Sequence, residues 1–204
     1  DRGVDGFRVD VAHGLIKAEG LPDFDEEQSL LDGQSGPMWD QDGVHEVYRR
    51  WRRVLDSYDG DRSLVAEAWV ADPQRLALYL RPDEMHTAFN FQFLDSHWDA
   101  AAYREVIAST MAADEAVGAP TTWVLSNHDV LRHVSRLGLA DPGSSHEGLG
   151  AGDEQPNNVL GLRRARAATL MMLALPGSAY LYQGEELGLA DHTTLPDDLR
   201  QDPA

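Results

Sequence analysis

The sequence predicts a parallel α/β fold. Short apolar runs bounded by turn residues alternate along the chain with longer segments in which apolar side chains recur at helical spacing. The 204 residues, of which 42% are hydrophobic, are enough for one domain with a sizeable core. Because they are rich in β-branched, aromatic or small apolar residues, five runs are predicted to be strands: residues 6–10, 63–66, 87–91, 121–125 and 178–182.

Three segments between these runs are predicted to be helices. Apolar residues recur every three or four positions over residues 44–58, and the arginines at 49, 50, 52 and 53 should form a solvated charged face. A second helix is expected over residues 99–115, and a third from about 160 to 175. The second helix should turn four side chains inward: Tyr103, Val106, Ile107 and Met111. Residues 20–43 and 141–158, dense in Gly, Pro, Ser, Asp and Asn, are predicted to be long functional loops.

Composition limits the possible partners and chemistry. A net charge of −18 argues against nucleic acid and anionic membranes as partners, so a neutral substrate fits better. The apolar stretch at residues 165–175 is too short to span a bilayer. The absence of cysteine excludes disulfides, thiol catalysis and thiolate metal sites.

Three of the predicted strands end in polar or ionisable residues. Asp10 closes the first run, Glu67 follows the second, and residues 127–129 (Asn-His-Asp) follow the fourth. Because successive side chains of a strand alternate between its faces, Arg8 and Asp10 share one face, where the arginine can keep the carboxylate ionised. In a parallel sheet the carboxyl ends of all strands lie on one side, so these residues are expected to converge. If they did not, an unrelated α/β binding protein with carboxylates that merely cap helices would be the better interpretation.

Four segments of the chain resemble, in the same order, signature blocks of the alpha-amylase superfamily of glycoside hydrolases. They are GFRVD at 6–10, VAEAW at 65–69, SNHD at 126–129 and YLYQGEELG at 180–188, the last resembling the alpha-glucosidase and oligo-1,6-glucosidase branch. The resemblance covers nearly the whole chain and implies a TIM (β/α)8 barrel, of which the five runs correspond to about the fourth through eighth strands.

The resemblance also implies roles for the polar residues. Asp10 would be the nucleophile that forms a covalent glycosyl-enzyme, with Arg8 keeping it deprotonated. Glu67 would be the general acid and base, with a pKa raised by its apolar surroundings next to Trp69. Asp129 would stabilise the transition state. Such a retaining mechanism predicts a distance of roughly 5–5.5 Å between the carboxyl groups of Asp10 and Glu67.

Three further residues are expected to bind substrate. His128 should donate a hydrogen bond to the sugar ring, and Asn127 could serve chiefly to shape the turn that presents its neighbours. Val11 follows the nucleophile, and in the alpha-glucosidase branch a valine there resembles the members that favour α-1,6 bonds. Short malto- or isomalto-oligosaccharides are therefore the expected substrates, and the preference between α-1,4 and α-1,6 bonds stays open.

The resemblance makes residues 1–204 the C-terminal portion of a catalytic barrel. The first three strands, an inserted loop domain and a C-terminal β-sandwich would lie outside the chain, so the fragment alone is expected to be poorly soluble or inactive. A cytoplasmic location is expected, and the oligomeric state is left open. No cofactor or metal is expected; family calcium sites would lie outside this chain, and an acidic group here is more simply a solvated loop: Asp23, Asp25, Glu26 and Glu27.

Two relatives with the same fold remain as alternatives. A glucosyltransferase or isomerase of the superfamily would use the same three carboxylates but favour a sugar over water as acceptor, acting on trehalose- or sucrose-type substrates. A non-catalytic amylase-like protein, such as the heavy chain of amino-acid transporters, typically lacks the intact carboxylates. The presence of Asp10, Glu67 and Asp129 argues against it.

Overall fold

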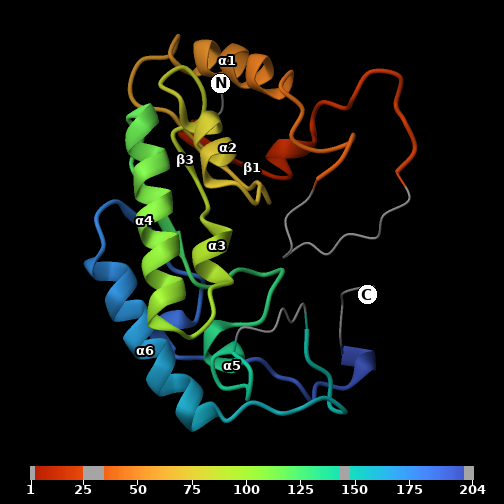
Figure 1. Ribbon diagram of the computed structural model, residues 1–204, viewed down its shortest axis with the longest axis vertical. Helices are drawn as coiled ribbons and strands as arrows, with labels where there is room; N and C mark the ends of the chain where they lie inside the picture. The colour runs from red at the N-terminus through yellow and green to blue at the C-terminus, as the bar shows by residue number, and fades with distance from the viewer. Residues whose placement is uncertain (1–2, 25–34, 143–147, 200–204) are drawn as a thin grey trace.

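The computed structural model describes residues 3–24, 35–142 and 148–199, and Figure 1 shows their arrangement. Every strand pairing is parallel. Three strands form one sheet in the order β1 (Gly6–Val9), β2 (Ser63–Ala66) and β3 (Thr87–Ala88). The other two, β4 (Thr122–Val124) and β5 (Ser178–Tyr180), pair with each other. The parallel α/β architecture predicted from the sequence is confirmed.

Helices connect the strands. They are α1 (Val44–Leu55), α2 (Pro73–Ala77), α3 (Phe91–Leu94), α4 (Ala100–Val117), α5 (His133–Arg136) and α6 (Asn158–Ala174), and the described residues add four 3-10 turns: η1 (Ala12–Gly14), η2 (Leu78–Leu80), η3 (Glu185–Leu187) and η4 (Asp197–Leu199). The two longest, α4 and α6, lie side by side (Figure 1). Each begins at a side chain that accepts hydrogen bonds from the first turn, Asp99 for α4 and Asn157 for α6. None of the described helices is long and apolar enough to cross a membrane.

Three sequence predictions need correction in their boundaries. The strand expected over residues 178–182 ends at Tyr180. The strand expected over residues 87–91 ends at Ala88, because the side chain of Asn90 accepts a hydrogen bond from the Phe93 N–H and starts α3. The helix expected over residues 44–58 ends at Leu55, and only part of its apolar face is covered: Trp51 and Val54 are 39% and 56% exposed. The short helices α2, α3 and α5 had no counterpart in the prediction.

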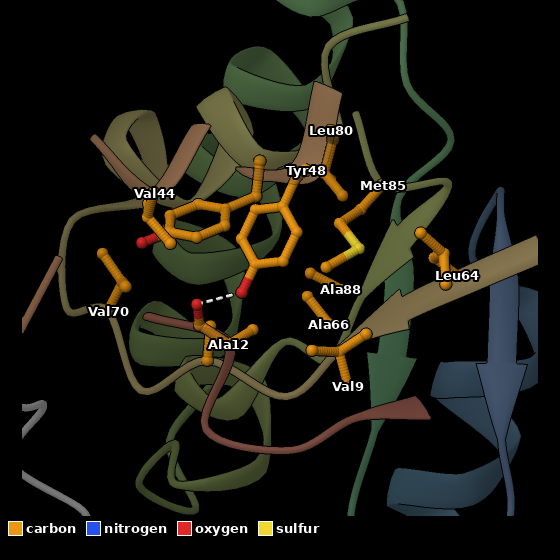
Figure 2. Close-up of a cluster of buried hydrophobic side chains, with 12 residues drawn as sticks. Val9, Ala12, Val44, Tyr48, Leu64, Ala66, Val70, Leu80, Met85 and Ala88 are labelled. Atoms are coloured by element: carbon orange, nitrogen blue, oxygen red, sulfur yellow. Dashed lines mark hydrogen bonds between the residues drawn. The ribbon is translucent and has the colours of Figure 1, made fainter. Parts of the chain in front are cut away.

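A buried apolar cluster packs against the segment that follows β1. Side chains of β1, β2 and β3 pack there against Val44 and Tyr48 of α1 (Figure 2). The Tyr48 hydroxyl donates a hydrogen bond to the carbonyl of Ala12. Because Ala12 lies two residues after Asp10, this core fixes the segment that follows β1.

A second cluster packs α4 and α6 against the other pair of strands. Its largest member, Trp123 of β4, is fully buried and donates its indole N–H to the carbonyl of Pro176 at 2.8 Å. Tyr103 is buried within it, and the other three side chains predicted to face inward from α4 pack against it partly buried. The inward face predicted for this helix is thus confirmed.

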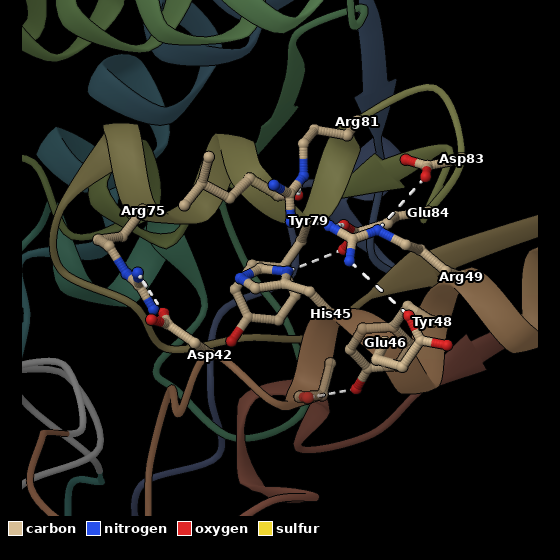
Figure 3. Close-up of polar contacts among 12 residues, drawn as sticks. Asp42, His45, Glu46, Tyr48, Arg49, Arg75, Tyr79, Arg81, Asp83 and Glu84 are labelled. Atoms are coloured by element: carbon tan, nitrogen blue, oxygen red, sulfur yellow. Dashed lines mark hydrogen bonds and ion pairs between the residues drawn. The ribbon is translucent and has the colours of Figure 1, made fainter.

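The arginines of α1 are not uniformly solvated, which corrects the prediction of a solvated charged face. The carboxylate of Glu84 is fully buried and receives the guanidinium of Arg49 at 3.2 Å, that of Arg81 at 2.6 Å and Nδ1 of His45 at 2.8 Å (Figure 3). Arg50 and Arg53 remain exposed, as expected. A buried carboxylate needs compensating charge, so Arg49 is drawn inward and ties α1 to the segment before β3.

Candidate active site

Residues in or just after β1, β3, β4 and β5 line a cavity of about 200 Å³. Residues from both sheets line it. The polar ones are Arg8 of β1 and Ser126, Asn127 and His128 after β4. Aromatic and apolar side chains complete the wall: Phe89, Phe91, Val124, Tyr180, Leu181 and Tyr182. The cavity brings Arg8 together with Asn127 and His128, but Asp10, Glu67 and Asp129 are not among the residues that line it. Asp10 and Glu67 lie close enough for their charges to interact, whereas the approach of Asp129 to them remains a prediction.

Asp10 stands at the end of β1, paired with the arginine two residues before it. Nη1 of Arg8 lies 2.6 Å from Oδ1 of Asp10, as the alternation of side chains predicts. The Asp10 side chain is 70% exposed, so the pair contributes little stability. Its consequence is geometric: one carboxylate oxygen is fixed by the guanidinium, and the other remains open to a ligand.

Val11, the next residue, has a backbone conformation that side chains rarely adopt. Its φ of 45° and ψ of 47° lie in the left-handed region, which is unfavourable for a β-branched residue. In this conformation its N–H donates a hydrogen bond of 2.7 Å to Oε2 of Glu67. The following amide, that of Ala12, donates to the Glu67 carbonyl at 2.8 Å. The chain after Asp10 is therefore bound to both the side chain and the backbone of Glu67.

Glu67 lies directly after β2 and is buried, with 4% of its surface exposed. Burial raises the pKa of its carboxyl above the ordinary value, and the nearby charge of Asp10 acts in the same direction. The Val11 N–H, the Arg8 guanidinium and the Trp69 side chain oppose the shift without cancelling it. Beyond Glu67, the ring of Trp69 stacks on Phe91 at 3.8 Å between centroids. Burial therefore raises the pKa as expected, whereas the neighbouring Trp69 side chain acts in the opposite direction.

The segment after β4 presents its side chains through a tight turn. Oδ1 of Asn127 accepts a hydrogen bond of 2.9 Å from the Asp129 N–H, so Asn127 shapes this turn as expected. Nε2 of His128 lies 3.3 Å from Oδ1 of Asp129. Both side chains are accessible, with 58% of His128 and 34% of Asp129 exposed, and are free to meet a ligand.

Several lining residues were not singled out from the sequence. Phe89 and Tyr180 meet edge to face at 4.8 Å, closing the cavity between the two sheets. Arg132 lies over the ring of Tyr182 at 4.7 Å and donates to the carbonyl of Gln183 at 2.7 Å. The available signal was an aromatic residue at or after a strand, which is indistinguishable in sequence from a core residue.

Two other features of the described residues lie apart from these side chains. A larger groove of about 710 Å³ lies between α4 and α6, lined mainly by apolar side chains such as Tyr103 and Met171. Its walls come from the helices and contain no strand end. In the part of the chain that the structure describes, no group of three or more histidine, aspartate or glutamate side chains could hold a metal ion. Of the acidic loop residues considered as cation ligands, 25–27 lie outside the described residues.

Residues 1–203 match the family described as "Alpha amylase, catalytic domain". The chain belongs to the alpha-amylase family. Its catalytic domain is a TIM barrel, of which this chain forms a part. The parallel pairing of all five strands agrees with that fold.

Relatives within the family extend over nearly the whole chain. It is 30% identical to the oligo-1,6-glucosidase of Parageobacillus thermoglucosidasius over 94% of its own length and 33% of the relative. It is 26% identical to the salivary alpha-glucosidase of Anopheles gambiae over 94% of its own length and 32% of the relative. The chain thus spans about a third of the length of the curated alpha-amylase family members it matches.

Solved structures agree with the fold. The alpha-glucosyl transfer enzyme XgtA superposes with a TM-score of 0.69 at 28% identity, over 93% of this chain and 34% of that one. A family GH13_31 enzyme superposes with a TM-score of 0.61 at 20% identity, over 92% of this chain and 32% of that one, and supports the fold alone.

Proposed function

We propose that the whole protein is a retaining alpha-glucosidase that hydrolyses short malto- or isomalto-oligosaccharides. The observation that carries this proposal is the pair of unlike carboxyl groups joined through Val11: Asp10 is exposed and held by Arg8, whereas Glu67 is buried with a raised pKa. Two carboxyl groups whose environments push their pKa values apart suit a nucleophile and a proton donor. The relatives named alpha-glucosidase and oligo-1,6-glucosidase support the same conclusion.

In the proposed first step, a carboxylate oxygen of Asp10 attacks the anomeric carbon of the glucosyl unit. The bond from this carbon to the leaving oxygen breaks, and the proton of Glu67 passes to that oxygen. In the second step, Glu67 takes a proton from water while the water oxygen attacks the anomeric carbon and releases Asp10. Each step inverts the configuration at the anomeric carbon, so the product keeps the configuration of the substrate.

Asp129, His128 and Asn127 are proposed to hold the sugar. An accessible carboxylate at Asp129 can accept hydrogen bonds from hydroxyl groups near the developing positive charge, and His128 can donate to the same ring. Asn127 contributes through the turn that it shapes. The aromatic wall formed by Phe89 and Tyr180 suits the apolar faces of a pyranose. No step requires a cofactor or metal.

We further propose that the described strands are about the fourth to eighth of the barrel and that the first three belong to sequence outside this chain. The exposure of Phe7, 61% although it lies in β1, is consistent with a neighbouring element that covers this edge. A loop domain after the third strand and a β-sandwich after the barrel complete the proposed organisation.

Transfer of the glucosyl group to a sugar is the second candidate, because XgtA, to which the chain is similar, is described as an alpha-glucosyl transfer enzyme. Hydrolysis and transfer share the first step and differ in the acceptor of the second. The ratio of free glucose to longer oligosaccharides released from maltose and isomaltose separates the two. The same measurement decides between α-1,4 and α-1,6 bonds, for which Val11 gives a weak preference for α-1,6.

The decisive experiment is hydrolysis of p-nitrophenyl α-glucoside, maltose and isomaltose by the full-length protein and two variants. Asp10→Asn should lose activity on all three substrates. Glu67→Gln should lose far more activity on the disaccharides than on the nitrophenyl glucoside. Nitrophenolate can leave without a proton, whereas the sugar oxygen of a disaccharide must be protonated as it leaves. Undiminished activity of Asp10→Asn would remove the assignment of the nucleophile.

A further inference from the structure

The segment that presents Asn127, His128 and Asp129 is anchored from behind by α5. The backbone N–H of His133 donates to Oγ of Ser126 at 2.9 Å, and Nδ1 of its ring lies 2.9 Å from the same oxygen. Both residues are buried, each with 2% of its surface exposed. The residue immediately before the Asn-His-Asp segment is therefore held by both the backbone and the side chain of His133.

Arg136, one turn further along α5, holds the same segment one residue earlier. Its guanidinium is buried and donates to the carbonyl of Leu125 at 2.8 Å and to the carbonyl of Leu94. Burial lowers the pKa of this guanidinium, and the carboxylates of Asp95, Glu185 and Asp191 favour its charged form. A buried cation of this kind requires negative charge nearby.

Glu185 supplies a buried negative charge at this place. It belongs to η3, which follows β5, and its side chain is only 2% exposed. Oε1 of Glu185 lies 3.5 Å from Nδ1 of His133, and neither carboxylate oxygen has a hydrogen-bond partner among the described residues. Because the hydrogen-bond partner of Nδ1 is Oγ of Ser126, at 2.9 Å, Glu185 acts on the His133–Ser126 pair through its proximity and charge, while Nε2 of His133 lies 3.3 Å from the Thr169 hydroxyl.

We propose that Glu185 is a positioning residue: through His133 and Arg136 its buried charge fixes the segment that carries Asn127, His128 and Asp129. Glu185 does not line the cavity at the strand ends, so it acts on a sugar only through that segment. The inference rests on the proposed function for its effect on catalysis. The contact between His133 and Glu185 links the segment after β4 to the segment after β5, more than fifty residues later in the chain.

The test compares Glu185→Gln with Glu186→Gln in the full-length protein. Glu186 is the matched control: its carboxylate is exposed and accepts a hydrogen bond from the Gly184 N–H, which a glutamine oxygen can still accept. Glu185→Gln should lower kcat roughly 10- to 100-fold with little change in KM, since a shift of about 1 Å in a catalytic group has an effect of this size. Glu185→Asp should recover part of the loss, and Glu186→Gln should resemble the wild type. A wild-type kcat in Glu185→Gln would overturn the proposal.

A positioning role also predicts that the loss depends on Asp129. In the Asp129→Asn background, Glu185→Gln should cause little further loss of kcat, whereas a general structural defect would lower it again by the same factor and so contradict the proposal. Hydrogen exchange gives a readout without activity: Glu185→Gln should speed exchange of the amides of residues 126–129, and Glu186→Gln should not. If the wild type cleaves no α-glucoside, the proposed function fails while exchange still decides this inference. Unchanged exchange in Glu185→Gln would overturn it.

Discussion

The backbone N–H of Val11 donates a 2.7 Å hydrogen bond to Oε2 of Glu67, so the residue after Asp10 holds the carboxyl group proposed as the proton donor. Val11 forms this bond in a left-handed backbone conformation. A β-branched residue in this region stores strain that the surrounding structure must overcome, and such strain concentrates at functional sites. Here it joins the ends of β1 and β2 next to Asp10.

This strain predicts an unusual order of stability at position 11. Val11→Gly should be more stable than Val11→Ala by about 1 kcal/mol, because glycine adopts positive φ without steric cost while alanine does not. Both variants keep the amide that donates to Glu67. Urea unfolding of the two full-length variants measures the difference, and a more stable alanine variant would show that the conformation is not strained.

The raised pKa of Glu67 predicts that activity falls as the pH rises through that pKa, because the proton donor is then ionised. Trp69→Phe keeps an apolar ring beside the carboxyl but removes the indole N–H, whose interaction with the carboxyl lowers the pKa, so it should move the alkaline limb of kcat/KM to higher pH. Tyr58→Phe, a change at a half-exposed ring that does not line the cavity, is the control and should leave the limb in place. A limb that stays in place or moves to lower pH in Trp69→Phe would contradict this effect of the indole.

The same pKa makes a prediction about stability. A carboxyl group whose pKa is higher in the folded than in the unfolded state binds more protons when folded, so the free energy of unfolding decreases as pH rises from about the model-compound pKa through the folded pKa. Glu67→Gln removes this term. Its Tm relative to that of the wild type should therefore be higher at pH 8 than at pH 4. A difference that does not change with pH would contradict the raised pKa.

Local patterns in the sequence predict much of this architecture. The strand runs lie where apolar composition places them, and the pairing of Arg8 with Asp10 follows from the alternation of side chains along a strand. Convergence of the strand ends follows from parallel pairing alone. The apolar surroundings of Glu67 could be inferred from its position between a buried strand and Trp69.

What the sequence did not reveal depends on contacts between distant segments. Phe89 and Phe91 alternate with Asn90 as in a strand, but the Phe93 N–H donates a hydrogen bond to Oδ1 of Asn90, which starts a helix there. Arginine is usually a solvated surface residue, yet Arg136 is buried. Its guanidinium donates there to the carbonyls of Leu94 and Leu125. Glu84 is buried against His45 and Arg49, which come from α1, some forty residues earlier.

Asp114 gives a prediction of pH dependence away from the site. Burial raises the pKa of this carboxyl in α4 to about 6, against the opposing effect of a hydrogen bond with Thr121. Stability should therefore decrease between about pH 4 and pH 6, the window between the unfolded and folded pKa values. Asp114→Asn should remove this part of the pH dependence of Tm without changing the pH profile of activity. An unchanged slope of Tm against pH in the variant would contradict the shift.

The buried carboxylate of Glu84 predicts the largest loss of stability. Glu84→Gln leaves Arg49, Arg81 and His45 without their shared acceptor of charge, and breaking a buried ion pair from one side typically lowers the free energy of unfolding by about 3–5 kcal/mol. Asp83→Asn is the matched control, because Asp83 pairs with the same Arg49 at 3.3 Å but its side chain is 64% exposed. That change should lower the free energy of unfolding by less than about 1 kcal/mol. Equal effects of the two substitutions in urea unfolding would mean that burial does not set the strength of this network.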